Sequence, residues 1–389
     1  MGGPEETLSE EIDPRVSTRG RPAPGLVLVY SEGTPRLRAA LLPPAGLEIG
    51  RGAFAGMPLD DQRLSSRHVR VAWSGGGWSI ADLESHNGTY VDGRRVTGEA
   101  TFDRACVLRA GRTLFLLAND VRRFVGASVK RDGDALVGPT LLGAWQEIER
   151  AARSGDVLLL TGESGVGKDL ASRAFHARAG ARGPFVAVNC AAIPEGLAER
   201  LLFGTRRGAY SGATEDADGY VQAADGGTLF LDEVADLDSS VQAKLLRAIE
   251  AKEIVPLGAS RPRRVEVRVC SAARDLRRAV AEGRFREDLY FRIGRPEVSI
   301  PPLRERCEEI PWLLAAELER ARAGLTAAPA LVEACMLRPW PGNVRELLSE
   351  TRRMSGAVGD RDTVGLQDLA RDAGAELPRA AARPSAARD

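Results

Sequence analysis

The sequence has no long hydrophobic run, few cysteines and histidines, and no excess of charge of either sign. No apolar stretch approaches the roughly 20 residues that a bilayer-spanning helix needs, so no membrane association is expected. The N-terminus is acidic and lacks the basic-then-apolar layout of a secretory signal. The 54 basic and 54 acidic residues balance, which excludes the global basic field of many nucleic-acid-binding proteins.

The cysteines also argue against a disulfide framework or a zinc site. There are five of them, scattered and never in CxxC spacing, and only three histidines accompany them. We interpret these cysteines as reduced core residues of a cytoplasmic protein. With 389 residues, the chain has room for two or three domains.

A glycine-rich loop between a predicted strand and a predicted helix is the most informative feature. The apolar residues 157–160 precede TGESGVGK, and a helix-forming run begins at Asp169. In such a loop several backbone N–H groups and a helix N-terminus face one anion, while Lys168 reaches the outer phosphates. Asp169 replaces the hydroxyl residue that usually helps to hold Mg²⁺. The predicted nucleotide-binding residues are Gly162, Glu163, Ser164, Gly165, Val166, Gly167, Lys168 and Asp169.

A second buried strand, residues 227–231, ends in Asp232 and Glu233. Alone, such an acidic pair would often just cap the next helix. Downstream of a P-loop it predicts that Asp232 holds Mg²⁺ through water and that Glu233 polarises the water attacking the γ-phosphate. The sequence therefore predicts binding of ATP with Mg²⁺.

The N-terminal third has a different texture. Residues 1–24 have the composition of a flexible tail, whereas residues 26–118 alternate short predicted strands with glycine-containing turns, which is typical of a β-sandwich. Three polar clusters fall at strand ends, around residues 50–51, 65–68 and 85–89. This pattern resembles a forkhead-associated (FHA) domain, whose family binds phosphothreonine peptides.

The resemblance implies that Arg51 and Ser65 hold the phosphate. It also implies that His68 braces the loop and that Asn87 grips the peptide backbone. Guanidinium, hydroxyl and amide donors make charge-assisted bonds to a dianion. Ser66 stands where a basic residue is common, so the site has one positive charge fewer; the alternative is a sandwich used only for packing or protein contact. The expected phosphopeptide site is Arg51, Ser65, Ser66, His86 and Asn87.

After a charged segment at residues 119–135, interpreted as a linker or connecting helix, predicted strands and helices alternate as in a parallel sheet covered on both faces. Motifs follow in order: LFG at 202–204, GAYSGA at 208–213, FREDLYFR at 285–292, PPLRER at 301–306 and WPGNVREL at 340–347. Together with the P-loop they resemble the central AAA+ domain of bacterial enhancer-binding proteins, which activate sigma-54 RNA polymerase. The resemblance implies an α/β subdomain at 136–310 and a helical lid at 311–372, with residues 373–389 expected to be disordered.

The resemblance also implies roles for residues outside the P-loop. Asn189 would restrain Glu233 until the γ-phosphate is sensed, and Arg345 on the lid would contact the nucleotide within its own subunit. Arg286 and Arg292 would be arginine fingers that reach the ATP of a neighbouring subunit, which implies a ring, in this family a hexamer. The alternative for either arginine is a surface salt bridge with Glu287 or Asp288.

Three departures from the family bear on coupling to transcription. The family's GAFTGA loop, which contacts sigma-54, has Tyr210 and Ser211 in place of its aromatic and threonine, and Thr205 and Arg206 replace a histidine and an acid at the loop base. The strand at 267–274 is one residue short where the family carries a polar sensor, and only Ser271 is available as a substitute. No helix-turn-helix is recognisable after residue 369, so direct DNA binding is not predicted. The expected sigma-54 contact is Gly208, Ala209, Tyr210, Ser211, Gly212 and Ala213.

Two functions remain open at this point. The first is an FHA-regulated, cytoplasmic AAA+ ATPase that remodels sigma-54 RNA polymerase and receives its input as phosphothreonine from a Ser/Thr kinase pathway. The second is a phosphothreonine-binding signalling or scaffold protein whose ATPase has drifted and no longer activates sigma-54. The altered loop, the shortened strand and the lack of a recognisable DNA-binding module favour the second function, whereas the intact catalytic set favours the first.

Overall fold

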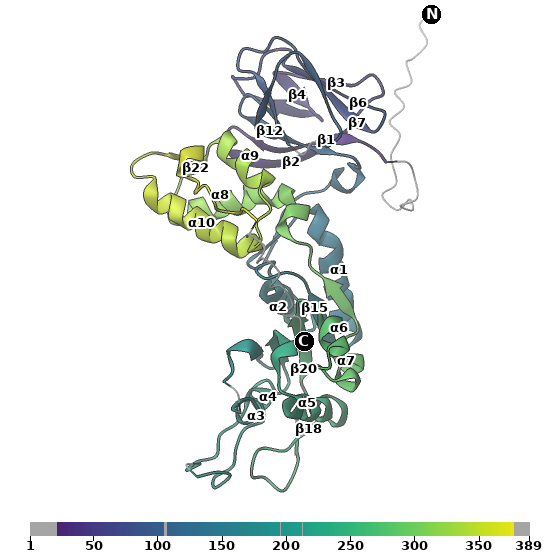
Figure 1. Cartoon of the computed structure of the whole chain (residues 1–389), viewed down its shortest axis with the longest axis vertical. Helices are drawn as coiled ribbons and strands as arrows, with labels where there is room; N and C mark the ends of the chain where they lie inside the picture. The colour runs from purple at the N-terminus through teal and green to yellow at the C-terminus, as the bar shows by residue number, and fades with distance from the viewer. Residues whose placement is uncertain (1–21, 105–106, 195, 212, 377–389) are drawn as a thin grey trace, which may run out of the picture.

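The computed structural model describes residues 22–376 apart from residues 105–106, 195 and 212. The molecule is elongated: a β-sandwich lies at one end, a helical lid beside it and an α/β subdomain beyond (Figure 1). Loops beside α3, α4 and β18 form the end opposite to the sandwich. Within the described residues, no helix has the length and apolar character needed to cross a membrane.

Two antiparallel sheets form the sandwich, as the alternating pattern predicts. Its core includes Leu26, Leu28, Trp78, Ile80 and Phe115. The larger sheet has the order β2(Thr34–Leu41), β1(Gly25–Ser31), β12(Thr113–Ala118), β11(Val107–Ala110), β8(Thr89–Val91) and β9(Arg94–Val96). The smaller has the order β10(Glu99–Phe102), β7(Gly77–Asp82), β6(Val69–Ser74) and β3(Leu47–Ile49), with a separate hairpin of β4(Gly52–Phe54) and β5(Met57–Leu59).

The segment after the sandwich differs from the charged linker or connecting helix that its composition indicates. It contains a short 3-10 helix, η1(Arg122–Phe124), and a hairpin of β13(Lys130–Asp132) and β14(Ala135–Val137). Val121 and Phe124 are buried in the core described below. This charged segment is therefore held to the core by Val121 and Phe124, which its composition alone does not reveal.

A five-stranded parallel sheet forms the α/β subdomain, with helices on both faces as predicted. The helices α1(Pro139–Ser154) and α2(Lys168–Arg178) cover one face. The other face is covered by α3(Ala198–Phe203), α5(Ser239–Ala251), α6(Leu276–Ala281) and α7(Glu287–Ile293). The strand order is β16(Phe185–Asn189), β17(Thr228–Asp232), β20(Arg268–Ala273), β15(Val157–Thr161) and β21(Glu297–Ser299).

Two short elements near the far end complete this subdomain. Helix α4 (Tyr220–Ala223) follows the 208–213 loop, and β18 (Glu253–Ile254) pairs with β19 (Arg263–Arg264). Cys190 and Cys270 are buried free thiols, as is Cys335 of the lid. They agree with the interpretation as core residues, while Cys106 lies outside the described residues.

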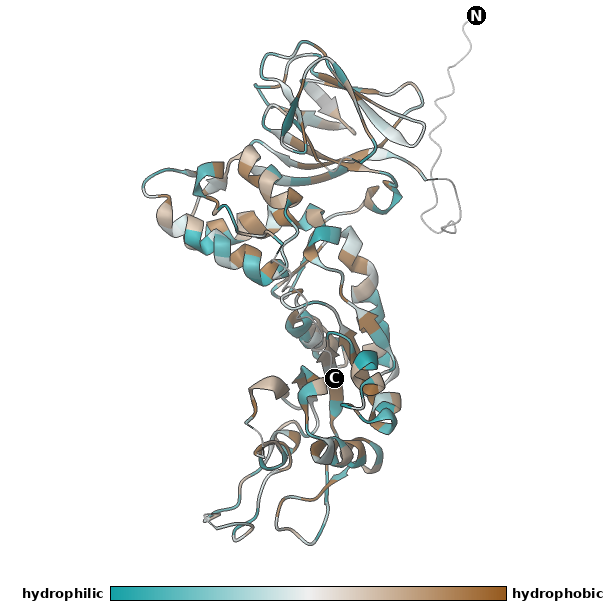
Figure 2. Cartoon of the chain, in the orientation of Figure 1, coloured by the Kyte–Doolittle hydropathy of each residue, from teal (hydrophilic) through white to brown (hydrophobic). Residues whose placement is uncertain are grey.

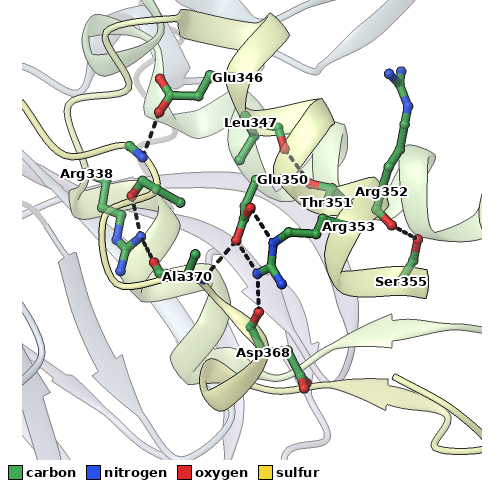
Figure 3. A network of polar contacts seen from close by, with 12 residues as sticks. Arg338, Glu346, Leu347, Glu350, Thr351, Arg352, Arg353, Ser355, Asp368 and Ala370 are labelled. Carbon is green, nitrogen blue, oxygen red and sulfur yellow. Dashed lines mark hydrogen bonds and ion pairs between the residues drawn. The ribbon is translucent and has the colours of Figure 1, made fainter. Parts of the chain in front are cut away.

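The helices α8(Ile310–Ala321), α9(Pro329–Leu337) and α10(Asn343–Ala357), with β22(Thr326–Ala327), β23(Thr363–Val364) and η6(Leu366–Asp368), form what we call the lid. A polar network joins α10 to the chain that follows it (Figure 3): Glu350 binds Arg353 and accepts from the Ala370 N–H at 2.8 Å. The Gly374 N–H donates to Glu346 at 2.8 Å. The chain is thus held through residue 374, slightly beyond the predicted start of the tail; residues 377–389 lie outside the described part, as do residues 1–21.

The sandwich and the lid share one hydrophobic core. All seven residues of β1 are buried: Leu26 and Leu28 point into the sandwich, whereas Val27 and Val29 point toward the lid. Helix α8 packs against β2, and α9 packs against β11 and β12. Figure 2 shows hydrophobic residues on both sides of this boundary. The outer face of the larger sheet is therefore an internal surface of the chain.

Candidate nucleotide site and its flanking surfaces

The P-loop connects β15 to α2 and has a backbone that only glycine adopts readily. Gly162, Gly165 and Gly167 have φ angles of 149°, 76° and 103°. Lys168 is 7% exposed, and its Nζ donates to the carbonyl oxygens of Gly162 at 3.0 Å and Glu163 at 3.3 Å. Burial lowers the pKa of this lysine. Since space is open around Gly167, the loop fits a phosphate chain held by backbone N–H groups and Lys168.

The lid contacts the P-loop directly. Arg345 Nη1 donates to Ser164 Oγ at 3.2 Å, which places this predicted residue at the loop. Asn343 is fully buried and donates to the Ser164 carbonyl at 3.0 Å and to Glu163 at 3.1 Å. A Cβ on Gly165 would lie 2.1 Å from the carbonyl oxygen of Gly342, so the loop and the lid approach at backbone distance.

Residues of the PPLRER segment also hold the P-loop, a role that the motif alone does not reveal. Arg304 binds Glu163 through two bonds of 2.7 and 2.9 Å, and this contact lowers the pKa of the Glu163 carboxyl to about 2. Arg306 is buried and donates to the Val166 carbonyl at 2.7 Å and to Glu309 at 2.7 Å. Glu308 and Glu309 follow these arginines in the sequence, and such a nearby acidic pair is the pattern from which a buried, paired arginine could have been predicted.

Asp232 and Glu233 leave the end of β17 beside the P-loop. Asp232 Oδ1 accepts from the Glu233 N–H at 3.1 Å, and Glu233 has a left-handed backbone with φ 51° and ψ 50°. The charges of both carboxylates act on Lys168. Among the described residues no three metal-binding side chains cluster. A few carboxylates beside a phosphate cradle fit Mg²⁺, which usually keeps several waters and binds substrate phosphates.

The other residues predicted around the nucleotide have different surroundings. The Asn189 side chain accepts from the Ala191 N–H at 3.1 Å, and within the described part of the chain no hydrogen bond joins it to Glu233. Arg286 pairs with Asp288 at 2.6 Å, which is the surface salt bridge considered as its alternative. Arg292 is exposed and, among the described residues, forms neither a hydrogen bond nor an ion pair.

Ser271 does not fill the sensor position. Its side chain is fully buried inside the sheet, paired with Leu159 and Leu231, two residues before β20 ends. Its hydroxyl lacks a hydrogen-bond partner in the described residues. The residue that leaves the strand at the nucleotide edge is Arg274, which was not among the predicted site residues.

The 208–213 loop lies far from the sandwich and is closed at its base. Thr205 and Ala217 exchange backbone hydrogen bonds of 2.8 and 2.9 Å, and Arg206 pairs with Asp216 at 2.5 Å. The altered charge at Arg206 is thus neutralised locally. Tyr210 is 41% exposed, and its hydroxyl accepts from Arg200 at 2.7 Å, so the added hydroxyl has a partner. Gly212 lies outside the described residues.

The three polar clusters of the sandwich converge at one end. The Arg51 N–H donates to the Ser65 carbonyl at 2.9 Å, and the His86 N–H donates to Ser65 Oγ at 3.2 Å. Asn87 Nδ2 donates to the Arg63 carbonyl at 2.8 Å. Ser66, like Arg51 and His86, is exposed. The predicted phosphopeptide residues therefore occupy neighbouring loops.

His68 supports these loops from below. It is fully buried, its Nδ1 accepts from the Ser65 N–H at 3.1 Å, and its Nε2 lies 3.2 Å from the Gly88 carbonyl oxygen. Burial lowers the pKa of its imidazole. A neutral imidazole that accepts at Nδ1 donates at Nε2, so both bonds form together and tie the 65–68 loop to the 85–89 loop.

The sandwich with three converging polar loops and the P-loop subdomain with its lid define a protein that joins an FHA-type domain to an AAA+ module. Family comparisons agree: residues 47–112 match the FHA domain, and residues 138–299 match the sigma-54 interaction domain. These two matches confirm the resemblance drawn from the motifs.

Two curated relatives illustrate the match. The nitric oxide reductase transcription regulator NorR2 of Cupriavidus necator is 47% identical over 248 residues, covering 60% of this chain and 47% of that protein. The DNA-binding transcriptional regulator NtrC of Rhizobium meliloti is 40% identical over 268 residues, covering 66% of this chain and 55% of that protein. The chain spans about half the length of the curated relatives it matches.

A solved structure supports the fold of the ATPase part. NtrX of Brucella abortus in complex with ADP superposes with a TM-score of 0.56 and 33% identity, covering 66% of this chain and 58% of that one. Its complex with ATP gives the same TM-score at 32% identity, covering 62% of this chain and 57% of that one.

Proposed function

We propose that the chain is an AAA+ ATPase that hydrolyses ATP with Mg²⁺ as a ring, of six subunits by the family resemblance, and remodels sigma-54 RNA polymerase in the cytoplasm under the control of its FHA domain. The observation that carries this proposal is the meeting of Lys168, Asp232 and Glu233 at one edge of a parallel sheet. The nucleotide complexes of NtrX support the choice of ATP as substrate.

In this function the chain's own residues divide the work. Lys168 neutralises charge on the outer phosphates, and Asp232 holds the water shell of the metal ion. Glu233 orients the attacking water and accepts its proton. Mg²⁺, when bound, neutralises charge that develops on the phosphate oxygens. Asn189 would act as the switch on Glu233 by giving up its bond to Ala191.

Arg292 is the better placed of the two arginine fingers. It has no partner among the described residues, and its neighbour Phe291 is 70% exposed, so α7 presents an apolar and cationic surface to a second copy of the chain. Arg286 would have to leave Asp288 before it could reach a neighbouring nucleotide. A finger supplied in trans is worth about 10³–10⁵ in rate.

The 208–213 loop is the proposed contact with sigma-54, and the FHA loops are the proposed receiver of phosphothreonine. Replacement of threonine by Ser211 removes one methyl, worth about 1 kcal/mol if buried at the interface. This is about fivefold in affinity, which weakens contact without abolishing it. In the FHA domain, Arg51 and Ser65 carry the phosphate, and loss of such a charge-assisted bond costs about 1.5–3 kcal/mol.

The second candidate, a phosphothreonine-binding signalling protein with a drifted ATPase, is favoured by the buried Ser271, which leaves the usual sensor position without a polar hydroxyl or amide. The experiment measures ATPase activity against protein concentration, with Lys168→Ala and Glu233→Gln as inactive controls, and open-complex formation at a sigma-54 promoter with wild type and Ser211→Thr. Activity that rises more than linearly, with a gain in Ser211→Thr, supports the first function. Turnover without open complexes in either protein supports the second.

A further inference from the structure

Arg274 lies where the two halves of the nucleotide site meet. Strand β20 runs between β15, which leads into the P-loop, and β17, which ends at Asp232. Asp232 and the following Glu233 form the Walker B pair. Its last residue, Ala273, is paired with Thr161 of β15. The next residue, Arg274, therefore leaves the sheet between the P-loop and Glu233.

Two cavities at this edge share the Arg274 side chain. One of about 380 Å³ is lined by Gly162 and Glu163, and one of about 470 Å³ is lined by Glu233. Arg274 is the residue common to both linings. Its charge adds to burial in lowering the pKa of Lys168, so the guanidinium acts on the lysine that reaches the outer phosphates.

The guanidinium of Arg274 forms no hydrogen bond or ion pair with the described residues, and the side chain is exposed. Neighbouring arginines are paired: Arg278 with Glu282 at 2.7 Å, Arg284 with the same carboxylate at 2.6 Å, and Arg304 with Glu163 at 2.7 Å. The Arg274 guanidinium therefore has five N–H donors without a protein acceptor, and it lies beside a loop shaped for phosphates. This arrangement points to an anionic ligand.

We propose that Arg274 contacts the γ-phosphate of ATP bound in its own subunit and so takes the place of the polar sensor that the shortened strand lacks. This inference rests on the proposed nucleotide site. In this structure, the side chain that leaves the sheet between the P-loop and Glu233 is that of Arg274. An arginine binds phosphate oxygens through two N–H groups, so it distinguishes ATP from ADP by the group that only ATP carries.

The test compares binding of a non-hydrolysable ATP analogue and of ADP, both with Mg²⁺, by the full chain and three variants. Arg274→Ala is expected to weaken binding of the analogue about tenfold or more and to leave ADP binding within about twofold. The affinity of Arg274→Lys for the analogue should lie between those of wild type and Arg274→Ala, because lysine keeps the positive charge but lacks the paired N–H donors of the guanidinium. Arg278→Ala is the matched control: it lines the same cavity but is already paired, so both affinities should stay near wild type.

Three outcomes would contradict this account in different ways. An Arg274→Ala protein that binds the analogue as tightly as wild type has lost no γ-phosphate contact. Equal weakening for the analogue and ADP would show a general effect of charge instead. A wild-type chain that binds neither nucleotide would overturn the proposed function itself. Because Arg274 is exposed and unpaired, its variants should unfold at the wild-type temperature.

Discussion

The lid has two boundaries of opposite character. Toward the sandwich it is apolar and continuous, with Val27 and Val29 in the same core as Leu331 and Leu314. Toward the P-loop it is polar, made of hydrogen bonds from the side chains of Asn343 and Arg345. Apolar burial is non-directional and is lost only when the surfaces separate, whereas polar contacts can exchange for contacts with a ligand.

This difference indicates which parts of the molecule move together. An interface that resembles a domain interior behaves as one body, and a boundary of hydrogen bonds at a nucleotide site is where closure takes place. We therefore expect the FHA domain and the lid to move as a unit relative to the α/β subdomain. Nucleotide binding and phosphopeptide binding would then be linked through the lid, and any such linkage is reciprocal.

The largest effect is expected at Glu333, the one carboxylate of α9 that faces the sandwich. It is 2% exposed, binds Arg109 at 2.6 Å and accepts from the Gly93 N–H at 3.0 Å. Glu333→Ala leaves the Arg109 guanidinium, whose side chain is only 16% exposed, without its partner and should cost about 3 kcal/mol in the free energy of unfolding. Chemical denaturation measures this loss.

A matched control is Tyr30→Phe, which removes only the hydrogen bond from the Tyr30 hydroxyl to the Ala327 carbonyl oxygen at the same boundary. This variant leaves one carbonyl unsatisfied and should cost about 1–3 kcal/mol. If Glu333→Ala costs no more than Tyr30→Phe, the buried ion pair does not hold the boundary.

At the polar boundary between the lid and the P-loop, Asn343→Ala is expected to lower the free energy of unfolding by an intermediate amount. Asn343 Oδ1 accepts from the buried Leu303 N–H at 2.8 Å, and its loss leaves this donor unpaired at a cost of about 1–3 kcal/mol. Because Asn343 also holds the Ser164 carbonyl, nucleotide affinity should fall together with stability. Calorimetric titration with ADP measures the affinity; an unchanged value would show that the lid does not shape the P-loop.

The smallest effect is expected for the ion pair between Arg304 and Glu163, whose contribution to stability depends on pH. Arg304 lowers the pKa of Glu163 to about 2, below its ordinary value of 4.5. The resulting stabilisation is present above pH 4.5 and is lost as the pH falls toward 2. Both side chains are partly exposed, so Arg304→Gln should cost only about 0–1 kcal/mol at neutral pH. Unfolding curves of both proteins should converge in acid; a constant difference would assign the effect to something other than Glu163.

The sequence predicted the place of its motifs in the fold better than it predicted the contacts between the domains. The P-loop, the Walker B pair and the polar loops of the sandwich are local motifs, and each falls at the strand end where the pattern places it. The shared core was missed because apolar residues along β1 show that both faces are covered but do not show what covers the outer face. Arg274 was missed because the sequence alone does not show which side chain leaves β20 at the nucleotide edge, and this is visible only with the strand register.

Distances between spin labels test the central claim most directly. Labels on cysteines introduced at three exposed positions, Arg94 of the FHA domain, Ala357 of the lid and Arg247 of the α/β subdomain, report both boundaries in one protein. On addition of a non-hydrolysable ATP analogue with Mg²⁺, we expect the 94–357 distance to stay constant and narrow while the 357–247 distance changes. A 94–357 distance that shifts or broadens with nucleotide, at an unchanged 357–247 distance, would contradict the account.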